Sequence, residues 1–179
     1  MFILASASPR RKELLKKVTE DFVIIVPDVD EKILHLSPKD LAIEESKQKA
    51  YAISSKHPDD EVLACDTIVV LDGEILGKPK DEQEAFSMLR RQSGKKQTVL
   101  SGYTYIGKGK EISRTVATDV YFNQLSDELI LDYIAKKKPL DKAGAYGIQD
   151  GYPLIDHYVG SFDNVMGLPT EDLIKHLPR

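Results

Sequence analysis

Cysteine, long apolar runs and excess positive charge are all scarce in this sequence, and each scarcity excludes a class of protein. The one cysteine, Cys65, cannot form an internal disulfide or a cysteine-based zinc site, and it lies in an apolar run typical of a buried, reduced thiol. No apolar stretch approaches the roughly 20 residues of a membrane span. With 25 Lys and Arg residues against 29 Asp and Glu residues, the net charge of -4 argues against nucleic-acid binding. We therefore expect a cytoplasmic protein whose partners include neither a membrane nor a nucleic acid.

Internal repeats, low-complexity tracts and Pro-, Gly- or Ser-rich linkers are also absent from the sequence. A chain of 179 residues is long enough to bury a sizeable core without a structural metal. We expect a single domain over residues 1–179 with two lobes and no separable linker.

Apolar runs and helix caps predict the order of strands and helices. Strands are expected at 2–5, 22–26, 62–71, 97–106, 112–122 and 154–159. Helices are expected at 8–17, 37–56, 81–92 and 126–137, followed by a short terminal helix capped by Thr170. Because strands and helices alternate first and neighbouring strands follow later, the pattern predicts an α/β protein with a mixed sheet.

The segment from Leu4 to Arg11 has the chemistry of an anion site. It runs from a strand through a small-residue loop into a helix with arginines at positions 10 and 11. Helix N–H groups, the hydroxyls of Ser6 and Ser8 and the two guanidiniums would converge where a phosphate binds. The alternative is that Ser8 is only a helix cap and the arginines are surface charges. The pattern alone does not decide between them.

Carboxylates occur at two places that could hold a metal. Asp66 and Thr67 interrupt an otherwise apolar strand, and a buried carboxylate needs a partner such as a metal, a lysine or a cap. A structural ion pair remains the alternative for Asp66. Asp30 and Glu31 follow the second strand and on their own read as an exposed acidic turn. Together with Asp66 they would offer the oxygen ligands that Mg²⁺ or Mn²⁺ prefers.

Three further side chains are candidates for binding a nucleotide. Lys49 lies on the long helix, and Lys78 is a cation positioned between Gly77 and Pro79. Gln149 ends a glycine-rich stretch, and its amide can read the edge of a base. For Gln149 the alternative is an exposed residue in a tight turn. The lysines at 136–138 lie at a helix end and are expected to be solvated surface charges.

Six motifs in this order resemble the Maf family of nucleoside triphosphate pyrophosphatases, and the resemblance spans nearly the whole chain. They are Leu-Ala-Ser-Ala-Ser-Pro-Arg-Arg at 4–11, Ala-Cys-Asp-Thr-Ile-Val at 64–69, Gly-Lys-Pro at 77–79, Met-Leu-Arg-Arg-Gln-Ser-Gly at 88–94, Asp-Lys-Ala-Gly-Ala-Tyr-Gly-Ile-Gln at 141–149 and Val-Met-Gly-Leu-Pro at 165–169. The resemblance implies a two-lobed α/β fold with an elongated mixed sheet and a central cleft, similar to inosine triphosphatases. It also implies Mg²⁺-dependent cleavage of a nucleoside triphosphate, with Mn²⁺ as the alternative ion and a homodimer left open.

Roles follow from the resemblance for residues that match the motifs. Asp66 would be the catalytic acid group, as metal ligand or as base for the attacking water, and Asp30 or Glu31 would assist at the metal. Four residues would lie along the phosphates: Ser6, Arg10, Lys49 and Lys78. Three would match positions associated with the choice of base: Arg10, Thr67 and Gln149.

The Tyr-Gly-Ile-Gln sequence resembles the branch of the family that acts on dTTP and UTP, which implies removal of these and of modified pyrimidine triphosphates. Two departures are visible: Cys65 precedes Asp66, and Asp150 follows Gln149 where glycine is usual. Cys65 is interpreted as the replacement of one small buried residue by another, and the side chain of Asp150 is expected to face water. The alternatives are a pyrophosphatase for a modified purine nucleotide and a nucleotide-sensing regulator of cell division without turnover.

Overall fold

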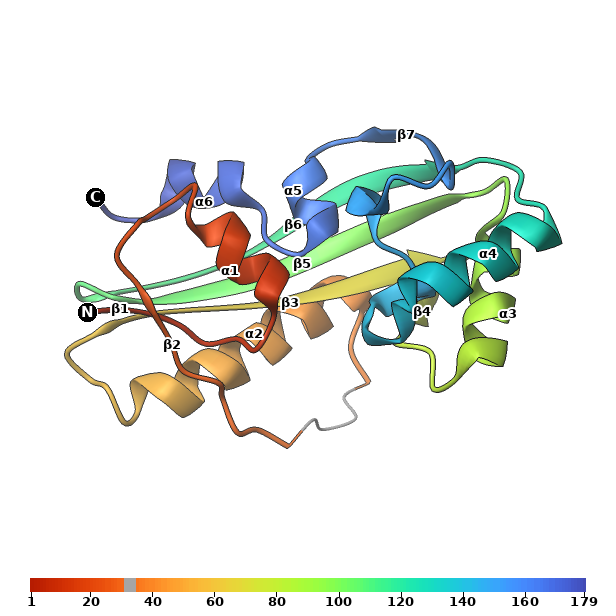
Figure 1. Cartoon of the computed structure of the whole chain (residues 1–179). Helices are drawn as coiled ribbons and strands as arrows, with labels where there is room; N and C mark the ends of the chain where they lie inside the picture. The colour runs from red at the N-terminus through yellow and green to blue at the C-terminus, as the bar shows by residue number, and fades with distance from the viewer. Residues whose placement is uncertain (31–34) are drawn as a thin grey trace. The chain divides into compact units, whose positions relative to one another are not determined.

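The computed structural model describes residues 1–30 and 35–179, whose helices and strands follow the predicted order (Figure 1). The strands are β1 Phe2–Leu4, β2 Val23–Ile24, β3 Glu61–Leu71, β4 Glu74–Leu76, β5 Lys96–Gly107, β6 Lys110–Phe122 and β7 Ile155–Val159. The α-helices are α1 Pro9–Leu15, α2 Pro38–Ser54, α3 Glu82–Gln92, α4 Asp127–Lys137, α5 Phe162–Met166 and α6 Thr170–His176. The sequence pattern did not predict α5.

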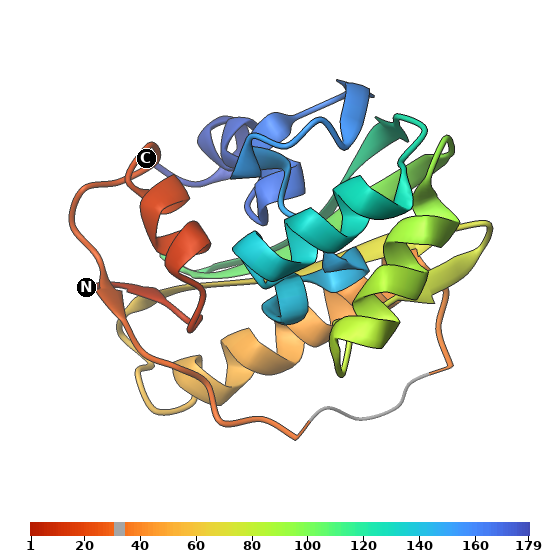
Figure 2. The ribbon, with the colours of Figure 1, turned by 45° about the vertical axis from the view of Figure 1, so that its right-hand side comes forward.

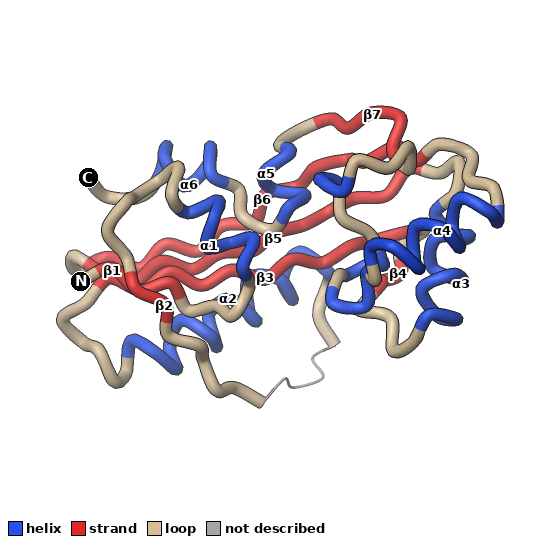
Figure 3. The backbone as a smooth tube through the Cα atoms, viewed as in Figure 1, coloured by secondary structure: helices blue, strands red, loops and turns tan. Residues whose placement is uncertain are grey.

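The strands of the described residues form one seven-stranded sheet in the order β2-β1-β3-β5-β6-β7, with β4 paired to β3 (Figure 3). β1 is parallel to both β2 and β3, with Leu4 opposite Ile24 on one side and Leu63 on the other. β4 is antiparallel to β3, and β7 is antiparallel to β6. The predicted mixed sheet of an α/β protein is therefore confirmed.

The chain divides into two compact units, which are described separately. The first unit contains Met1–Thr67, Leu100–Val116 and Asp163–Arg179, and the second contains Ile68–Val99 and Ala117–Phe162. Each of the long strands β3, β5 and β6 contributes residues to both units.

The core of the first unit has two layers because alternate residues of a strand point to opposite faces of the sheet. One face of β1, β3 and β5 packs against α1 and α6, through Leu4, Leu14, Leu15, Leu63, Cys65, Tyr103, Tyr105, Leu168 and Leu173. The other face packs against α2, through Ile3, Ala5, Ala50, Ile53, Val62 and Ala64. Figure 1 shows α1 and α2 on opposite sides of these strands. The apolar runs around Ala5 and Asp66 are thus buried on both faces.

In the second unit α3 and α4 lie side by side (Figure 2). A buried polar network attaches the glycine-rich segment at 142–149 to α3 and β5. Gln92 of α3 donates to the carbonyl oxygen of Gly144 at 2.7 Å, and the hydroxyl of Tyr146 donates to Gln97 Oε1 at 3.0 Å. Gln97 completes the network by donating to Gln92. Gly144 itself has a positive φ of 73°, a conformation that favours glycine.

Most of the predicted helix caps are present. Four side chains accept the expected hydrogen bond from a backbone N–H three residues on: Ser8, Ser37, Asp81 and Ser126. The predicted cap at Thr170 is wrong. Thr170 is the first residue of α6, and its buried hydroxyl donates to Asp163 instead. No helix among the described residues is long and apolar enough to cross a membrane.

The first unit also holds a partly buried charge cluster around Asp172 of α6. Its carboxylate accepts from the hydroxyl of buried Tyr103 at 2.7 Å and from Arg114 Nε at 2.8 Å. Burial acts to raise the pKa of Asp172, but the hydrogen bonds from Arg114 and Tyr103 outweigh it and hold that pKa below its ordinary value. A carboxyl whose native pKa is lowered stabilises the fold above its unfolded pKa, and the contribution is lost as the pH falls through the native pKa.

Asp172→Asn is therefore expected to destabilise the protein near neutral pH by about 1 to 2 kcal/mol, because one charge-assisted pair is lost while Tyr103 keeps an acceptor. The difference in the free energy of unfolding between the variant and wild type should become smaller below roughly pH 4, where this carboxyl group is also protonated in the unfolded chain. Urea unfolding at pH 7 and pH 3.5 measures the destabilisation and its decrease at low pH. Asp156→Asn, which changes an exposed aspartate, is the control. An equal difference at the two pH values would contradict this role.

Candidate active site

The loop after β1 leads into α1 through the predicted helix cap. Ser6 is buried, and its hydroxyl accepts a hydrogen bond from the backbone N–H of Ser8 at 3.1 Å. Ser8 in turn accepts from the N–H of Arg11 at 3.3 Å and caps α1. Arg10 lies half-buried in the first turn of this seven-residue helix. The small residues of the loop thus bring two hydroxyls and two arginines to the same helix end.

Arg11 connects the start of α1 to two distant segments of the first unit. Its Nε donates to the carbonyl oxygen of Gly167 at 2.7 Å, and its Nη2 donates to Thr67 Oγ1 at 3.1 Å. Gly167 has a φ of 128°, a conformation that glycine adopts most easily. The sequence drew attention to both arginines but assigned a role only to Arg10. The Val-Met-Gly-Leu-Pro motif was the available signal, because its glycine carries the carbonyl that fixes Arg11.

Asp66 has the partner that a carboxylate in an apolar strand requires. Lys49 Nζ of α2 lies 3.0 Å from Asp66 Oδ1, and the two side chains are only 20% and 16% exposed. Burial acts to raise the pKa of Asp66. The hydrogen bond with Glu45 and the positive charges of Lys49 and Arg11 outweigh burial, so the pKa lies below its ordinary value. Asp66 is therefore ionised at neutral pH.

Glu45 is a site residue that the sequence did not single out. It precedes Lys49 by one turn of α2, so both side chains leave the same face of the helix. Its carboxyl group forms a hydrogen bond with that of Asp66. The only sequence signal was this four-residue spacing from Lys49 on a polar helix, which is common and carries little information.

Two carboxyl groups side by side provide the hard oxygen donors that Mg²⁺ takes from a protein, usually one or two, with water and phosphate oxygens completing its shell. The pair of Glu45 and Asp66 therefore fits a divalent cation. Within 1–30 and 35–179, no group of three or more His, Cys, Asp or Glu side chains is placed to hold a metal. Asp30 is exposed, and Glu31 lies outside the described residues.

Lys78 and Gln149 belong to the second unit. Lys78 is exposed in the loop after β4, and Gln149 is exposed in a short 3-10 helix at Ile148–Asp150. The N–H of Gly144 donates to the carbonyl oxygen of Gly77 at 3.1 Å, which joins the Lys78 loop to the glycine-rich segment. Asp150 corrects an expectation: its carboxylate does not simply face water but accepts from the hydroxyl of Tyr133 at 2.6 Å.

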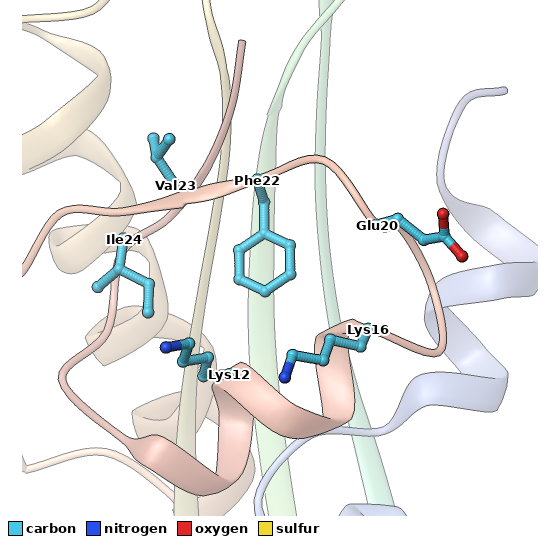
Figure 4. Close-up of a pocket in the computed structure, with 6 residues that line it drawn as sticks. All are labelled: Lys12, Lys16, Glu20, Phe22, Val23 and Ile24. Atoms are coloured by element: carbon cyan, nitrogen blue, oxygen red, sulfur yellow. The ribbon is translucent and has the colours of Figure 1, made fainter.

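A separate pocket of about 650 Å³ lies between α1 and β2 in the first unit (Figure 4). Its lining residues are Lys12, Lys16, Glu20, Phe22, Val23 and Ile24. None of them is a predicted site residue. Figure 4 shows the charged side chains of Lys12, Lys16 and Glu20 together with the apolar side chains of Phe22, Val23 and Ile24.

The family model and the curated relatives of this chain indicate one family. A family model described as Maf-like protein matches residues 1–179. A dTTP/UTP pyrophosphatase of Pyrococcus abyssi is 44% identical over 98% of this chain and 94% of its own length. Enzymes of the same name from Carboxydothermus hydrogenoformans and Bacillus cytotoxicus are 44% and 45% identical, over 97% and 98% of this chain and 95% and 93% of their own. A solved structure, the Staphylococcus aureus Ham1 protein, is 18% identical with a TM-score of 0.48, over 70% of this chain and 72% of that one.

Proposed function

The chain belongs to the Maf family, and from this membership we propose that it hydrolyses dTTP and UTP to the nucleoside monophosphate and pyrophosphate. The observation that carries the proposal is the cluster around Asp66. The partly buried, ionised carboxylate of Asp66 lies in an otherwise apolar strand and contacts Lys49. The positive charge of Arg11 also lowers the pKa of Asp66. Relatives at 44% identity over nearly the whole chain carry the same activity in their names.

The proposed reaction is attack of water on the α-phosphorus, with pyrophosphate as the leaving group. It requires positive charge around the phosphate oxygens and a carboxylate to orient the nucleophile. Asp66 has the ionised state that this task requires, and Lys49 holds its position. The proposed displacement takes place in one step, with water rather than a side chain as the nucleophile.

A bound divalent cation, Mg²⁺ or Mn²⁺, would offset negative charge on the phosphate oxygens. Asp66 and Glu45 would hold it, and Asp30 and Glu31 are proposed as additional ligands. Lys49 pairs with Asp66 at 3.0 Å and offsets its negative charge.

The remaining roles concern the substrate. Ser6, Arg10, Lys49 and Lys78 are proposed to bind phosphate oxygens, because a hydroxyl and three cations are the groups that hold a triphosphate. Thr67 and Gln149 are proposed to act on the choice of base. A Gln amide donates to one group of the uracil edge and accepts from another, a pattern that cytosine partly reverses.

Gln149→Ala is expected to narrow the preference for UTP over CTP by roughly tenfold, mainly by slowing UTP, because a mismatched base leaves polar groups unpaired. Values of kcat/KM for UTP, dTTP, CTP and GTP in wild type and variant measure this. Lys80→Ala, another exposed side chain of the second unit, is the control. Unchanged ratios of kcat/KM among the four nucleoside triphosphates would show that Gln149 does not select the base and is only a turn residue.

Pyrophosphate release from a panel of nucleoside triphosphates, with and without Mg²⁺, tests the proposed function. Fast release from UTP and dTTP only with the cation is expected. Preference for a methylated or otherwise modified purine nucleotide would support the alternative of a purine nucleotide pyrophosphatase. Nucleotide binding without pyrophosphate release would support the alternative of a nucleotide sensor. Removal of modified pyrimidine nucleotides, a cytoplasmic location and a homodimer stay predictions.

A further inference from the structure

A chain of buried hydroxyl groups connects strand β5 to Arg11 in the first unit. Ser101 of β5 is fully buried, and its Oγ lies 2.8 Å from Thr67 Oγ1. The same Oγ donates to the carbonyl oxygen of Asn164 at 3.3 Å. Thr67 Oγ1 accepts from Arg11 Nη2 at 3.1 Å. The Arg11 guanidinium is therefore linked through two hydroxyls to the interior of the unit.

The Thr67 hydroxyl accepts from Arg11 whichever way the proton between the two hydroxyls runs. A hydroxyl donates a single proton. Either Ser101 donates to Asn164 at 3.3 Å and accepts from Thr67, or Thr67 donates to Gly167 at 3.4 Å and accepts from Ser101. In both arrangements a lone pair of Thr67 is left for Arg11, and the 2.8 Å bond to Ser101 holds the Thr67 hydroxyl in place.

Removing the Ser101 hydroxyl would change the bonding of Arg11. The other acceptor within reach of the Thr67 hydroxyl is the carbonyl oxygen of Gly167, at 3.4 Å. That oxygen already accepts from Arg11 Nε at 2.7 Å. Without Ser101, the oxygen that Arg11 uses is the acceptor left within reach of the Thr67 hydroxyl, and the two anchors of the guanidinium would share it.

We propose that Ser101 is a positioning residue of the active site, which fixes the Thr67 hydroxyl and through it the direction of the Arg11 guanidinium. It acts without touching the nucleotide. The inference rests on the proposed pyrophosphatase activity and extends it to a residue outside the motifs. The inference includes a role for Arg11 at the phosphates, in addition to the one proposed for Arg10. A guanidinium held by two anchors would bind a phosphate in one orientation, whereas a mobile one would bind it in several, so the loss falls on turnover more than on binding.

Thr104 provides a matched control on the same strand. It is also fully buried, and its Oγ1 lies 2.8 Å from Ser46 Oγ and 2.9 Å from Ser113 Oγ. Both residues thus carry a hydroxyl that bonds two groups inside the first unit. Of these two residues, only Ser101 forms a hydrogen bond with Thr67. Thr104→Val removes the hydroxyl at nearly constant volume and reports what the loss of a buried hydroxyl does to stability alone.

The experiment measures kcat and KM for UTP, with the urea midpoint of each variant. Ser101→Ala is expected to lower kcat about tenfold while KM changes less than about twofold. Ser101→Thr keeps the hydroxyl and should stay within about threefold of wild type. Ser101→Cys, which keeps the volume but accepts hydrogen bonds weakly, should behave like alanine and replaces it if alanine does not fold. Thr104→Val should leave both constants unchanged.

A double-mutant cycle with Thr67→Val separates positioning from general damage. If Ser101 acts through Thr67, its removal should lower kcat less than about twofold further in the Thr67→Val background. The same tenfold loss in both backgrounds, or a loss in Thr104→Val equal to that in Ser101→Ala, would overturn the inference. A wild-type protein that releases no pyrophosphate from UTP would instead overturn the proposed function, and this inference with it.

Discussion

Asp66→Asn is expected to lower the rate of pyrophosphate release from UTP by about 1,000-fold or more, because several kcal/mol of charge stabilisation are lost at about 1.4 kcal/mol per factor of ten. Asparagine keeps the shape of the side chain and can still accept a hydrogen bond from Lys49. It cannot orient an attacking water as a base or give a full negative charge to a cation. Steady-state pyrophosphate release at saturating Mg²⁺ measures the effect.

Asp163→Asn is the matched control for this variant. Asp163 is also a buried aspartate of the first unit, but its carboxylate pairs with Lys17 at 2.9 Å and accepts from Thr170. Its loss should reduce stability and leave turnover within a few-fold of wild type. A rate for Asp66→Asn within a few-fold of wild type, with normal dependence on the metal, would remove Asp66 from the catalytic role.

Lys49→Ala carries the second-largest expected effect, a loss of kcat/KM of roughly 10- to 100-fold. Lys49 is proposed to bind phosphate, and its charge also lowers the pKa of Asp66. Without Lys49 that pKa rises, so the ionised form of Asp66 is lost at a higher pH. The acidic limb of the pH–rate profile should therefore move toward neutral pH in the variant.

Lys136→Ala serves as the control for Lys49→Ala, and it is also the control for the alanine variants of Arg10 and Lys78. Lys136 is an exposed lysine of the second unit that pairs with Asp132 at 3.0 Å. Its removal should change neither kcat/KM nor the pH profile. If it damaged catalysis as much as Lys49→Ala, or if the acidic limb of Lys49→Ala stayed in place, the assignment of the phosphate cations would be wrong.

The sequence predicted the elements well and singled out Asp66, because local signals specify the elements and the need of this carboxylate for a partner. Ser-Pro pairs and Asp81 mark helix starts through backbone N–H groups that need an acceptor, and each cap is present at Ser8, Ser37 and Asp81. Asp66 stood out because a carboxylate among buried aliphatic residues must have a partner. The structure supplies one, Lys49, on a helix 17 residues earlier in the chain.

The residues that the sequence missed depend on contacts between distant segments. Arg11 acts through Gly167, which is 156 residues away in the chain, and its neighbour Arg10 carries the same charge, so composition could not separate them. Glu45 differs from other acidic residues of α2 only by the face of the helix that meets β3. Asp150 was expected in water because nothing in its own segment shows that Tyr133 donates to it.

The most direct test of the central claim is hydrolysis of UTP in ¹⁸O-labelled water, with the products identified by mass spectrometry. Attack on the α-phosphorus predicts UMP and pyrophosphate in equal amounts, with one ¹⁸O atom in UMP and none in pyrophosphate. Label in pyrophosphate instead of UMP, or products consisting of UDP and inorganic phosphate, would contradict the proposed pyrophosphatase reaction.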